Sequence, residues 1–236
     1  MQILVWNIRH GGGSRAQEIA AYVRASGTDA VVLPECRDTG PSRFIRESIS
    51  EVFPHQAFTS PTSRTNSVLL ASRQSFREQR FTSLEENGYR VLCGAFEGFM
   101  LVAVYFPAVG ARIRPIFQRL LEIAGHLVDT KALIVGDFNT GINGADNASG
   151  RFTCSDEMTD LCQQGWVDVW RLRHLEKREF SWYSVAGNGF RIDHAFANPK
   201  LAKSVQSARY DHKVRTKGLS DHSSLWVEVC SECIAH

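Results

Sequence analysis

The chain has 236 residues, of which 43% are hydrophobic and 22% are charged, and its formal net charge is +2. This length allows a sizeable core within one domain, and the composition excludes a largely disordered chain. The small net charge does not indicate a polyanionic partner, although a local basic face is compatible with it. We therefore expect one globular domain that spans residues 1–236.

The first apolar run and the cysteines favour a cytoplasmic protein with no membrane partner. Asn7 and Arg9 interrupt the apolar run early, and no stretch approaches the length of a membrane-spanning helix. The six cysteines show no disulfide framework, as is typical of reduced thiols. Cys230-x-x-Cys233 with His236 offers metal ligands, but a single such pair is more typical of an unstructured tail.

Short β-rich runs alternate with helical patterns in the first part of the chain. Strands are predicted at residues 3–6, 30–33, 67–71, 90–96, 99–105 and 132–135. Helices are predicted at 15–26, where Gly27 is placed to end the helix, at 42–53 and at 113–129. The last of these has the clearest amphipathic pattern, because Ile116, Leu120, Ile123 and Leu127 share one face.

The second part of the chain continues the same mixture. A loop rich in Gly, Asn and Ser is predicted at 140–152, followed by a helix at 155–164. Further strands are predicted at 180–184, 191–198 and 223–229. This order of elements by itself indicates a mixed α/β domain and no more.

The polar residues of this chain fall at the ends of its predicted strands. Those that follow the carboxyl end of a strand are Asn7, Glu35, Tyr105, Asp137 and Asn139. Those at the start of a strand are Asp193, Asp221 and His222. Because strand ends and the starts of antiparallel neighbours lie on the same edge of a sheet, one arrangement would bring all of them together.

Such a gathering of four carboxylates predicts a metal site. Closely packed carboxylates repel one another and would partly protonate without a cation. Oxygen ligands from Asp, Glu and Asn suit a hard ion such as Mg²⁺, and Mn²⁺ can take its place. We therefore expect Mg²⁺ as the cofactor.

Six short motifs, in chain order, resemble those of the endonuclease/exonuclease/phosphatase superfamily, which contains exonuclease III, the abasic-site endonucleases and deoxyribonuclease I. They are Trp6-Asn7, Pro34-Glu35, Tyr105-x-Pro107, Gly136-Asp137-Phe138-Asn139, Arg191-Ile192-Asp193 and Ser220-Asp221-His222. The resemblance implies a four-layer αββα sandwich, in which two mixed β-sheets are flanked by helices.

The same resemblance implies a role for each metal-side residue. Glu35 would hold the catalytic Mg²⁺, with Asn7 close by and Asp221 near the ion. Asp137 would orient and deprotonate the attacking water, and Asn139 would help to position the phosphate.

The remaining catalytic roles follow from the same family. Asp193 would pair with His222 and fix its imidazole, which would contact the scissile phosphate. Tyr105 would hydrogen-bond the phosphate or assist the leaving oxygen.

The sequence combines motifs that resemble two different branches of the family. Tyr105-Phe106-Pro107, Phe180-Ser181-Trp182 and the segment 189–193, which contains Phe190, resemble the exonuclease III and abasic-site endonuclease branch. In that branch the region of Trp182 and Phe190 helps to bind a flipped-out abasic sugar. Asn7-Ile8-Arg9 instead resembles deoxyribonuclease I, since the first branch has an aspartate at the position of Arg9. Arg9 is then either a phosphate contact or a surface arginine, and a second metal position is in doubt.

Several features allow more than one interpretation. Taken singly, each of these polar residues is as compatible with a turn, a solvated loop or strand packing. The segment 10–14, His-Gly-Gly-Gly-Ser, is either a flexible turn or a close approach to phosphate. His10, His126, His174 and His212 are expected to face solvent, and His194 to lie opposite Asp193 across its strand. Cations for DNA contact are expected among Arg112, Arg114, Arg171, Arg173, Lys177, Arg178, Lys213, Arg215 and Lys217.

These observations predict a monomeric Mg²⁺-dependent phosphodiesterase whose partner is DNA, which it cuts to 3′-hydroxyl and 5′-phosphate ends. One alternative is a phosphatase or phosphodiesterase for a lipid or inositol phosphate, although the chain shows no apolar membrane-contact insertion. The other is a binding module without catalysis, which predicts lost catalytic residues.

Overall fold

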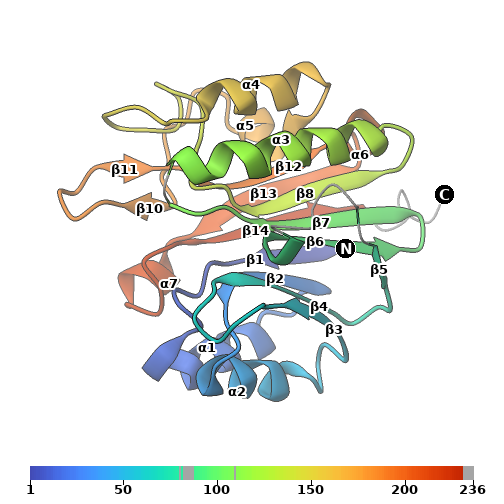
Figure 1. Cartoon of the computed structure of the whole chain (residues 1–236), viewed down its shortest axis with the longest axis vertical. Helices are drawn as coiled ribbons and strands as arrows, with labels where there is room; N and C mark the ends of the chain where they lie inside the picture. The colour runs from blue at the N-terminus through green and yellow to red at the C-terminus, as the bar shows by residue number, and fades with distance from the viewer. Residues whose placement is uncertain (80, 82–87, 109, 231–236) are drawn as a thin grey trace.

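The computed structural model describes residues 1–79, 81, 88–108 and 110–230. In these residues two six-stranded sheets pack face to face between two layers of helices (Figure 1). The four-layer αββα sandwich expected from the sequence is thus confirmed.

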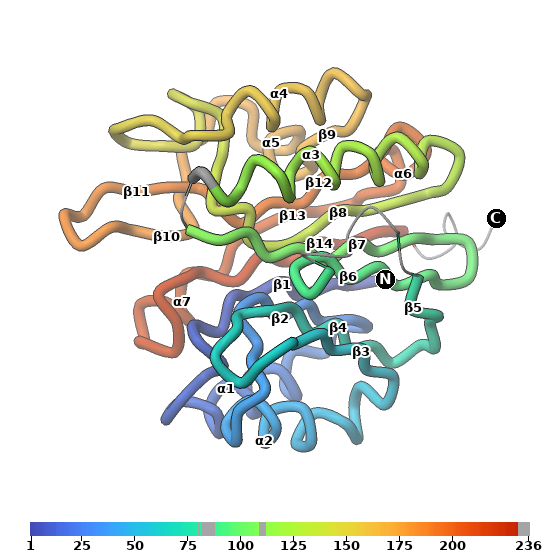
Figure 2. Tube along the Cα trace, in the orientation of Figure 1, coloured from blue at the N-terminus to red at the C-terminus, as the bar shows by residue number. Residues whose placement is uncertain are grey.

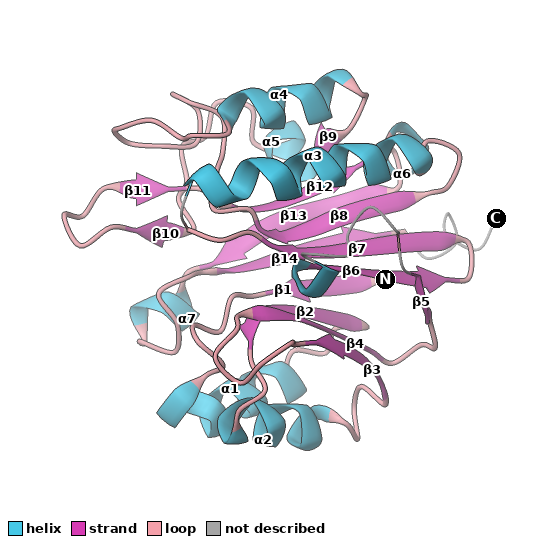
Figure 3. Ribbon diagram, viewed as in Figure 1, coloured by secondary structure: helices cyan, strands magenta, loops and turns pink. Residues whose placement is uncertain are grey.

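The first sheet has the strand order β13-β14-β1-β2-β4-β3. These strands are Val205–Asp211, Ser224–Val229, Gln2–Val5, Ala30–Cys36, Ser67–Ser72 and His55–Thr59. β1 and β2 are parallel, and the other pairs are antiparallel. Helices α1 (Ala16–Arg24) and α2 (Gly40–Ile49) cover its outer face, in the lower half of Figure 3.

The second sheet has the order β5-β6-β7-β8-β12-β9. Its strands are Arg77–Gln79, Val91–Phe96, Phe99–Tyr105, Ala132–Asp137, Asp193–Ala197 and Val167–Asp168. Here β7 and β8 are the parallel pair. Helices α3 (Gly110–His126) and α4 (Ser155–Gln163) cover the outer face of this sheet.

Short elements complete the described part of the chain. They are the 3₁₀ turns Gly13–Arg15 and Gly88–Arg90 and the helices α5 (Val169–Arg173), α6 (Pro199–Ala202) and α7 (Lys213–Thr216). A hairpin of β10 (Trp182–Tyr183) and β11 (Gly189–Phe190) projects from the body of the molecule (Figure 2).

The central strands are apolar on both faces because both faces are covered. In β8, for example, Leu133 and Val135 lie between the sheets, whereas Ile134 packs under α3 and α4. The predicted amphipathic helix contributes its whole apolar face, Ile116, Leu120, Ile123 and Leu127, to this second cluster. Alternation with a period of two therefore divides one apolar run between two cores.

The predicted elements differ from the structure mainly at their ends. The helix predicted at 42–53 runs from Gly40 to Ile49, since Pro41 favours the first turn of a helix. The strand predicted at 180–184 is limited to Trp182–Tyr183. The pattern missed the edge strands β3, β5, β9 and β13 and the helices α5, α6 and α7, which are short or rich in polar residues. The predicted tail Cys230-x-x-Cys233 with His236 reaches beyond the described residues.

A buried arginine ties the loop 140–152 to the second sheet. A guanidinium nitrogen of Arg191, which is 1% exposed, lies 2.7 Å from Asp146 Oδ1 and 2.7 Å from Asp168 Oδ2. Burial alone would raise the pKa of Asp168, but the Arg191 charge and the His194 hydrogen bond hold it well below its usual range. The pair therefore stays ionised inside the protein.

We expect Arg191→Met to lower the free energy of unfolding by about 3–5 kcal/mol, because it removes the arginine from the buried Asp168 and leaves Asp146 only its longer contact with Arg171. Urea unfolding at pH 7 measures this change. Because the folded pKa of Asp168 is depressed, its contribution is present above the unfolded pKa of about 3.9 and is lost as the pH falls. The difference between variant and wild type should therefore shrink in acid.

The matched control is Arg24→Met, which removes the exposed ion pair of Arg24 with Glu51. This change should alter the free energy of unfolding by less than about 1 kcal/mol. An equal effect of the two substitutions would contradict the stabilising role of the buried arginine.

Candidate active site

The register of the first sheet brings three of its strand ends to one edge. β1 and β2 run parallel, so Asn7, just after β1, lies beside Glu35 near the end of β2. β14 runs antiparallel to β1, so Asp221 and His222, which precede it, reach the same edge.

The second sheet delivers its polar residues to this edge in the same way. Tyr105 and Asp137 are directly paired across the parallel strands β7 and β8. Asp193 is paired with Asp137 across the antiparallel strands β8 and β12. The two sheets therefore place their polar ends against each other.

The fully buried side chain of Asn7 joins the two sets. Its Nδ2 donates to Glu35 Oε1 at 3.1 Å and to Asp137 Oδ2 at 2.8 Å, and lies 3.5 Å from His222 Nε2. Its Oδ1 accepts from the Arg9 backbone N–H at 2.8 Å. Both ends of the amide are therefore in use, and the NH₂ end faces the two carboxylates.

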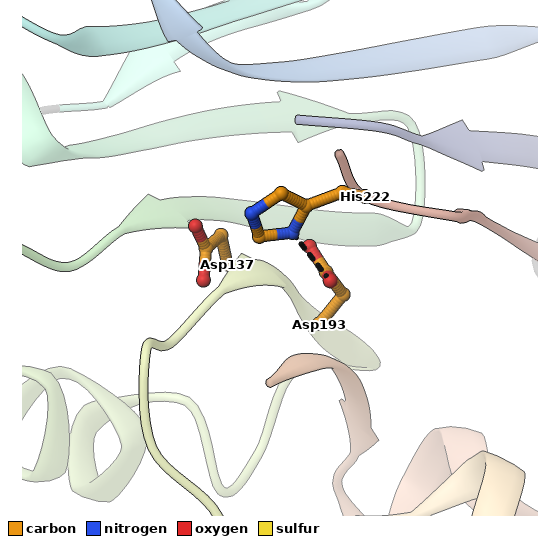
Figure 4. A group of neighbouring side chains, drawn as sticks. All are labelled: Asp137, Asp193 and His222. Atoms are coloured by element: carbon orange, nitrogen blue, oxygen red, sulfur yellow. Dashed lines mark hydrogen bonds and ion pairs between the residues drawn. The ribbon is translucent and has the colours of Figure 1, made fainter. Parts of the chain in front are cut away.

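His222 lies between Asp137 and Asp193 (Figure 4). Its Nδ1 contacts Asp193 Oδ2 at 2.8 Å. Burial alone would lower the pKa of His222, but the charge and hydrogen bond of Asp193 raise it to about 10. The imidazole is then protonated at neutral pH, so Nδ1 donates to Asp193 and Nε2 carries a second N–H.

The ligand atoms of Asp137, Asp193 and His222 lie within 4.8 Å of one another, a spacing that a metal ion could bridge. We favour a proton there, because Nδ1 of His222 is committed to Asp193 and a protonated ring offers no lone pair to a metal. Glu35 and Asp221, which line the neighbouring cleft, are carboxylates that could hold a cation.

Asp137 is buried completely, and this burial raises the pKa of its carboxyl to about 8 in spite of the opposing charge of His222. The negative charges of Asp193 and Glu35 add to the effect. The backbone N–H of Asn139 donates to Asp137 Oδ1 at 2.9 Å, and its side chain donates to the Phe106 carbonyl at 2.7 Å. Asp137 is thus held in one orientation and is able to exchange a proton near neutral pH.

The Tyr105 hydroxyl accepts a hydrogen bond of 3.0 Å from Asn66 Nδ2. Burial, together with the Glu35 charge, raises the pKa of this phenol well above its usual value. Tyr105 therefore stays protonated, and its O–H remains a hydrogen-bond donor.

A cleft of about 360 Å³ opens beside these residues. Its acidic and polar lining includes Glu35, Asn139, Asp221 and His222. The rest of the lining is mainly apolar and consists of Ala108, Ile113, Phe152, Trp182, Phe190 and Ile192, with Arg151 and Thr153. Trp182 Nε1 donates to Asp221 Oδ2 at 3.3 Å, which joins the aromatic lining to the acidic lining.

The model of the endonuclease/exonuclease/phosphatase family matches residues 4–222. The chain belongs to this family. The match runs from β1 to His222 and so includes all of the strand-end polar residues described above.

Solved structures of similar fold include a 3′ phosphatase and an AP endonuclease. The structure of a 3′ phosphatase, NExo, from Neisseria bound to a product DNA hairpin has a TM-score of 0.85 and 20% identity, and the match covers 97% of this chain and 99% of that one. An AP endonuclease from Archaeoglobus fulgidus has a TM-score of 0.84 and 21% identity, with coverage of 97% and 99%. At these identities the similarity establishes the fold of this family member.

The structure brings the strand-end residues together as expected. Asn7, Glu35, Asp137, Asn139, Asp193 and His222 are linked by direct contacts. Arg9 and Asp221 lie beside them, with Arg9 Nε 3.8 Å from Asp221 Oδ2, and Trp182 and Phe190 line the cleft. Sequence reasoning missed Asn66 and Arg37, which no motif marked, and it expected His10 only to face solvent, although His10 also contacts Glu35.

Other predictions on charged residues were less accurate. His174 and His212 do not simply face solvent, because each is half-buried and hydrogen-bonded. His194 does lie away from Asp193, against Asp168. Arg171, Arg173 and Arg178, which were candidates for DNA contact, bind backbone carbonyls of the protein. No helix in the described part of the chain is long and apolar enough to cross a membrane.

The ion pair of His222 with Asp193 should be visible in an NMR titration of the metal-free protein. We expect Asp193→Asn to lower the pKa of His222 by at least about one unit, because the largest raising influence is lost. The folded pKa of this histidine is raised, so the stabilisation from the pair is complete below about pH 6.5 and is lost as the pH rises toward 10. An unchanged titration of the ring in the variant would contradict this assignment.

Proposed function

We propose that this family member is a divalent-metal-dependent phosphodiesterase that hydrolyses DNA and leaves 3′-hydroxyl and 5′-phosphate ends. The observation that carries the proposal is the buried group of Asn7, Asp137, Asp193 and His222, of which His222 lines the cleft. The similar fold of a 3′ phosphatase bound to a DNA hairpin and of an AP endonuclease supports DNA as the substrate.

Glu35 and Asp221 would hold the metal, Mg²⁺ or Mn²⁺. Their carboxylate oxygens line one cleft and are the ligand type that these ions prefer. Among the described residues the buried Asp193 Oδ1 has no hydrogen-bond partner, and beside burial the negative charges of Asp193 and Glu35 help to raise the pKa of Asp137. A cation nearby would offset these charges. The bound ion would neutralise charge on the phosphate oxygens.

Asp137 would orient the attacking water and accept its proton. Burial raises the pKa of its carboxyl to about 8, so the ionised carboxylate is a stronger base than an exposed one. The side chain of Asn139, which bridges Asp137 and the Phe106 carbonyl, would guide the phosphate to the water.

His222 and Tyr105 would stabilise the charge that develops during the attack. The protonated His222, held by Asp193, presents its Nε2–H to a non-bridging phosphate oxygen. The protonated Tyr105 phenol would donate to the phosphate or to the leaving oxygen.

The aromatic side chains that line the cleft suggest how the substrate is bound. Trp182 and Phe190 line it with ring centroids 5.8 Å apart, and Phe152 lies against Phe190. Such a wall suits an unstacked sugar or terminal nucleotide next to the scissile phosphate. Arg9 would contact a flanking phosphate.

We further propose that one catalytic domain, acting as a monomer in the cytoplasm, includes all of these residues.

The decisive assay uses end-labelled duplexes that are intact, contain one abasic site or carry a 3′ phosphate, each with Mg²⁺ or with EDTA. We expect cleavage that depends on Mg²⁺. Asp137→Asn and His222→Ala should each lower the rate roughly 10³-fold, since a base and a charge-stabilising donor are lost.

The matched control for His222→Ala is His126→Ala, which changes an exposed histidine at the end of α3 and should leave the rate unchanged. Cleavage that persists in EDTA, or near-normal turnover of Asp137→Asn, would contradict the mechanism. Hydrolysis of inositol phosphates in place of DNA would show that DNA is not the substrate.

The aromatic wall gives a separate prediction. Trp182→Ala should raise KM for the preferred duplex by roughly tenfold or more, because stacking of an unstacked group on an aromatic ring is lost. Tyr183→Ala is the control, since this neighbour on the same short strand is not among the cleft residues and packs against Arg215. Similar KM values for the two variants would argue against a binding role of the wall.

A further inference from the structure

Asn66, the residue just before β4, lies between an arginine and the phenol of Tyr105. Its Oδ1 accepts a hydrogen bond from Nε of Arg37, and its Nδ2 donates to the Tyr105 hydroxyl oxygen at 3.0 Å. Neither Asn66 nor Arg37 belongs to a motif of the sequence, and the proposed mechanism gives neither of them a role. Their contacts nevertheless reach one of the groups that would act on the phosphate.

Arg37 determines which end of the Asn66 amide faces Tyr105. The Nε–H of an arginine can only donate, so the atom that it contacts must be the carbonyl oxygen of the amide. The NH₂ group is then directed toward the phenol, and it also lies 3.3 Å from Nδ1 of His10. Arg37 is itself held in place, because its backbone N–H donates to Ser42 Oγ at 3.2 Å. The amide therefore presents a donor, and not an acceptor, to the hydroxyl.

The hydrogen bond from Asn66 leaves the proton of the Tyr105 hydroxyl without an acceptor among the described residues. The Tyr105 side chain is 6% exposed, and the residue is paired with Asp137 across β7 and β8. A buried donor that lacks a partner costs free energy, so an oxygen of the substrate that accepts this bond would be stabilised.

An acceptor at position 66 would have the opposite effect on the phenol. A tyrosine hydroxyl donates one hydrogen bond, so a neighbouring carboxylate would take up its only proton. An N–H neighbour keeps that proton available, and hydrogen bonds in a chain strengthen one another. The identity of the group beside the hydroxyl thus decides whether Tyr105 can act as a donor.

We propose that Asn66, oriented by Arg37, is a positioning residue that keeps the Tyr105 hydroxyl free to donate to the phosphate or to the leaving oxygen. The inference rests on the proposed function, in which Tyr105 makes this donation, and adds the residues that set the direction of the hydrogen bond. Asn66 acts through Tyr105 and does not itself touch the reacting atoms.

The test compares kcat and KM of the wild type, Asn66→Asp, Tyr105→Phe and the double variant, on the duplex that the wild type cleaves fastest with Mg²⁺. Asn66→Asp keeps the shape of the side chain and the acceptor for Arg37, but it offers the phenol a carboxylate. We expect kcat to fall about tenfold or more, with KM little changed. In the Tyr105→Phe background the same substitution should cost less than about twofold, because the redirected hydrogen bond is already absent.

Two further variants separate the direction of the hydrogen bond from other effects. Gln74→Glu is the matched control, since it makes the same change from amide to carboxylate at an exposed residue beyond the other end of β4, and it should leave kcat unchanged. Asn66→Ala removes the donor without supplying an acceptor and should lose less activity than Asn66→Asp. Equal losses in these two variants at position 66 would overturn the inference. So would a loss that persists in the Tyr105→Phe background, since repulsion of the phosphate by the new charge would then explain it.

NMR of the substrate-free protein tests the inference independently of the reaction. In protein labelled with a carbon isotope at the tyrosine Cζ, the Tyr105 signal is identified by its absence in Tyr105→Phe. In Asn66→Asp this signal should move toward that of an ionised phenol, because the hydroxyl then donates to a carboxylate. An unmoved signal would overturn the inference whatever the protein hydrolyses. Duplexes that stay intact with wild-type protein and Mg²⁺ would instead contradict the proposed function, and the NMR result would still decide the direction of the hydrogen bond.

Discussion

The burial of carboxylates close to one another is the constraint on which this site depends. Glu35, Asp137 and Asp193 converge where the polar edges of the two sheets meet, and water is largely excluded from Asp137 and Asp193. Two kinds of donor, an amide and an imidazolium, hold the three carboxylates. The Asn7 amide is shared by Glu35 and Asp137, and the His222 imidazolium neutralises Asp193. Of the three, Glu35 lines the cleft, and this is where we propose that a cation binds.

The sequence predicted this convergence because apolar runs fix where strands end. In β1, β2 and β8 the run stops close to the polar residue, so a parallel pair such as β1 and β2 carries its polar ends side by side. An antiparallel neighbour begins at this same edge and so places its first residues there. Asp193 reaches the edge in this way at the start of β12, and His222 just before β14. The fold class followed from the same alternation of elements and from the motifs. The strands and helices that were missed are either short, as β5, β9 and α6 are, or rich in polar residues, as the seven-residue edge strand β13 is.

Contacts made by turns and long side chains could not be predicted in this way. His10 reaches Glu35 because the backbone is left-handed from Arg9 to Gly13, a property that the glycines permit but do not specify. The sequence suggested that Arg171 and Arg178 are surface cations. In the structure Arg171 donates to the carbonyl of Lys177, and Arg178 donates to the carbonyl of Asn147. Which acceptor lies within reach of an arginine depends on the packed tertiary structure, and a charge pattern along the chain does not contain that information.

Strand β12 shows why two different cations are used within one small region. Asp193 faces His222 on one side of this strand, and the next residue, His194, faces Asp168 on the other side, where Arg191 is the main cation. Arginine stays charged at every pH the protein meets, so it can hold the loop 140–152 and the second sheet together permanently. The charge of a histidine depends on its partner, and Asp193 keeps the His222 ring protonated at neutral pH. A histidine in place of Arg191 would therefore make the contact between the loop 140–152 and the second sheet dependent on pH.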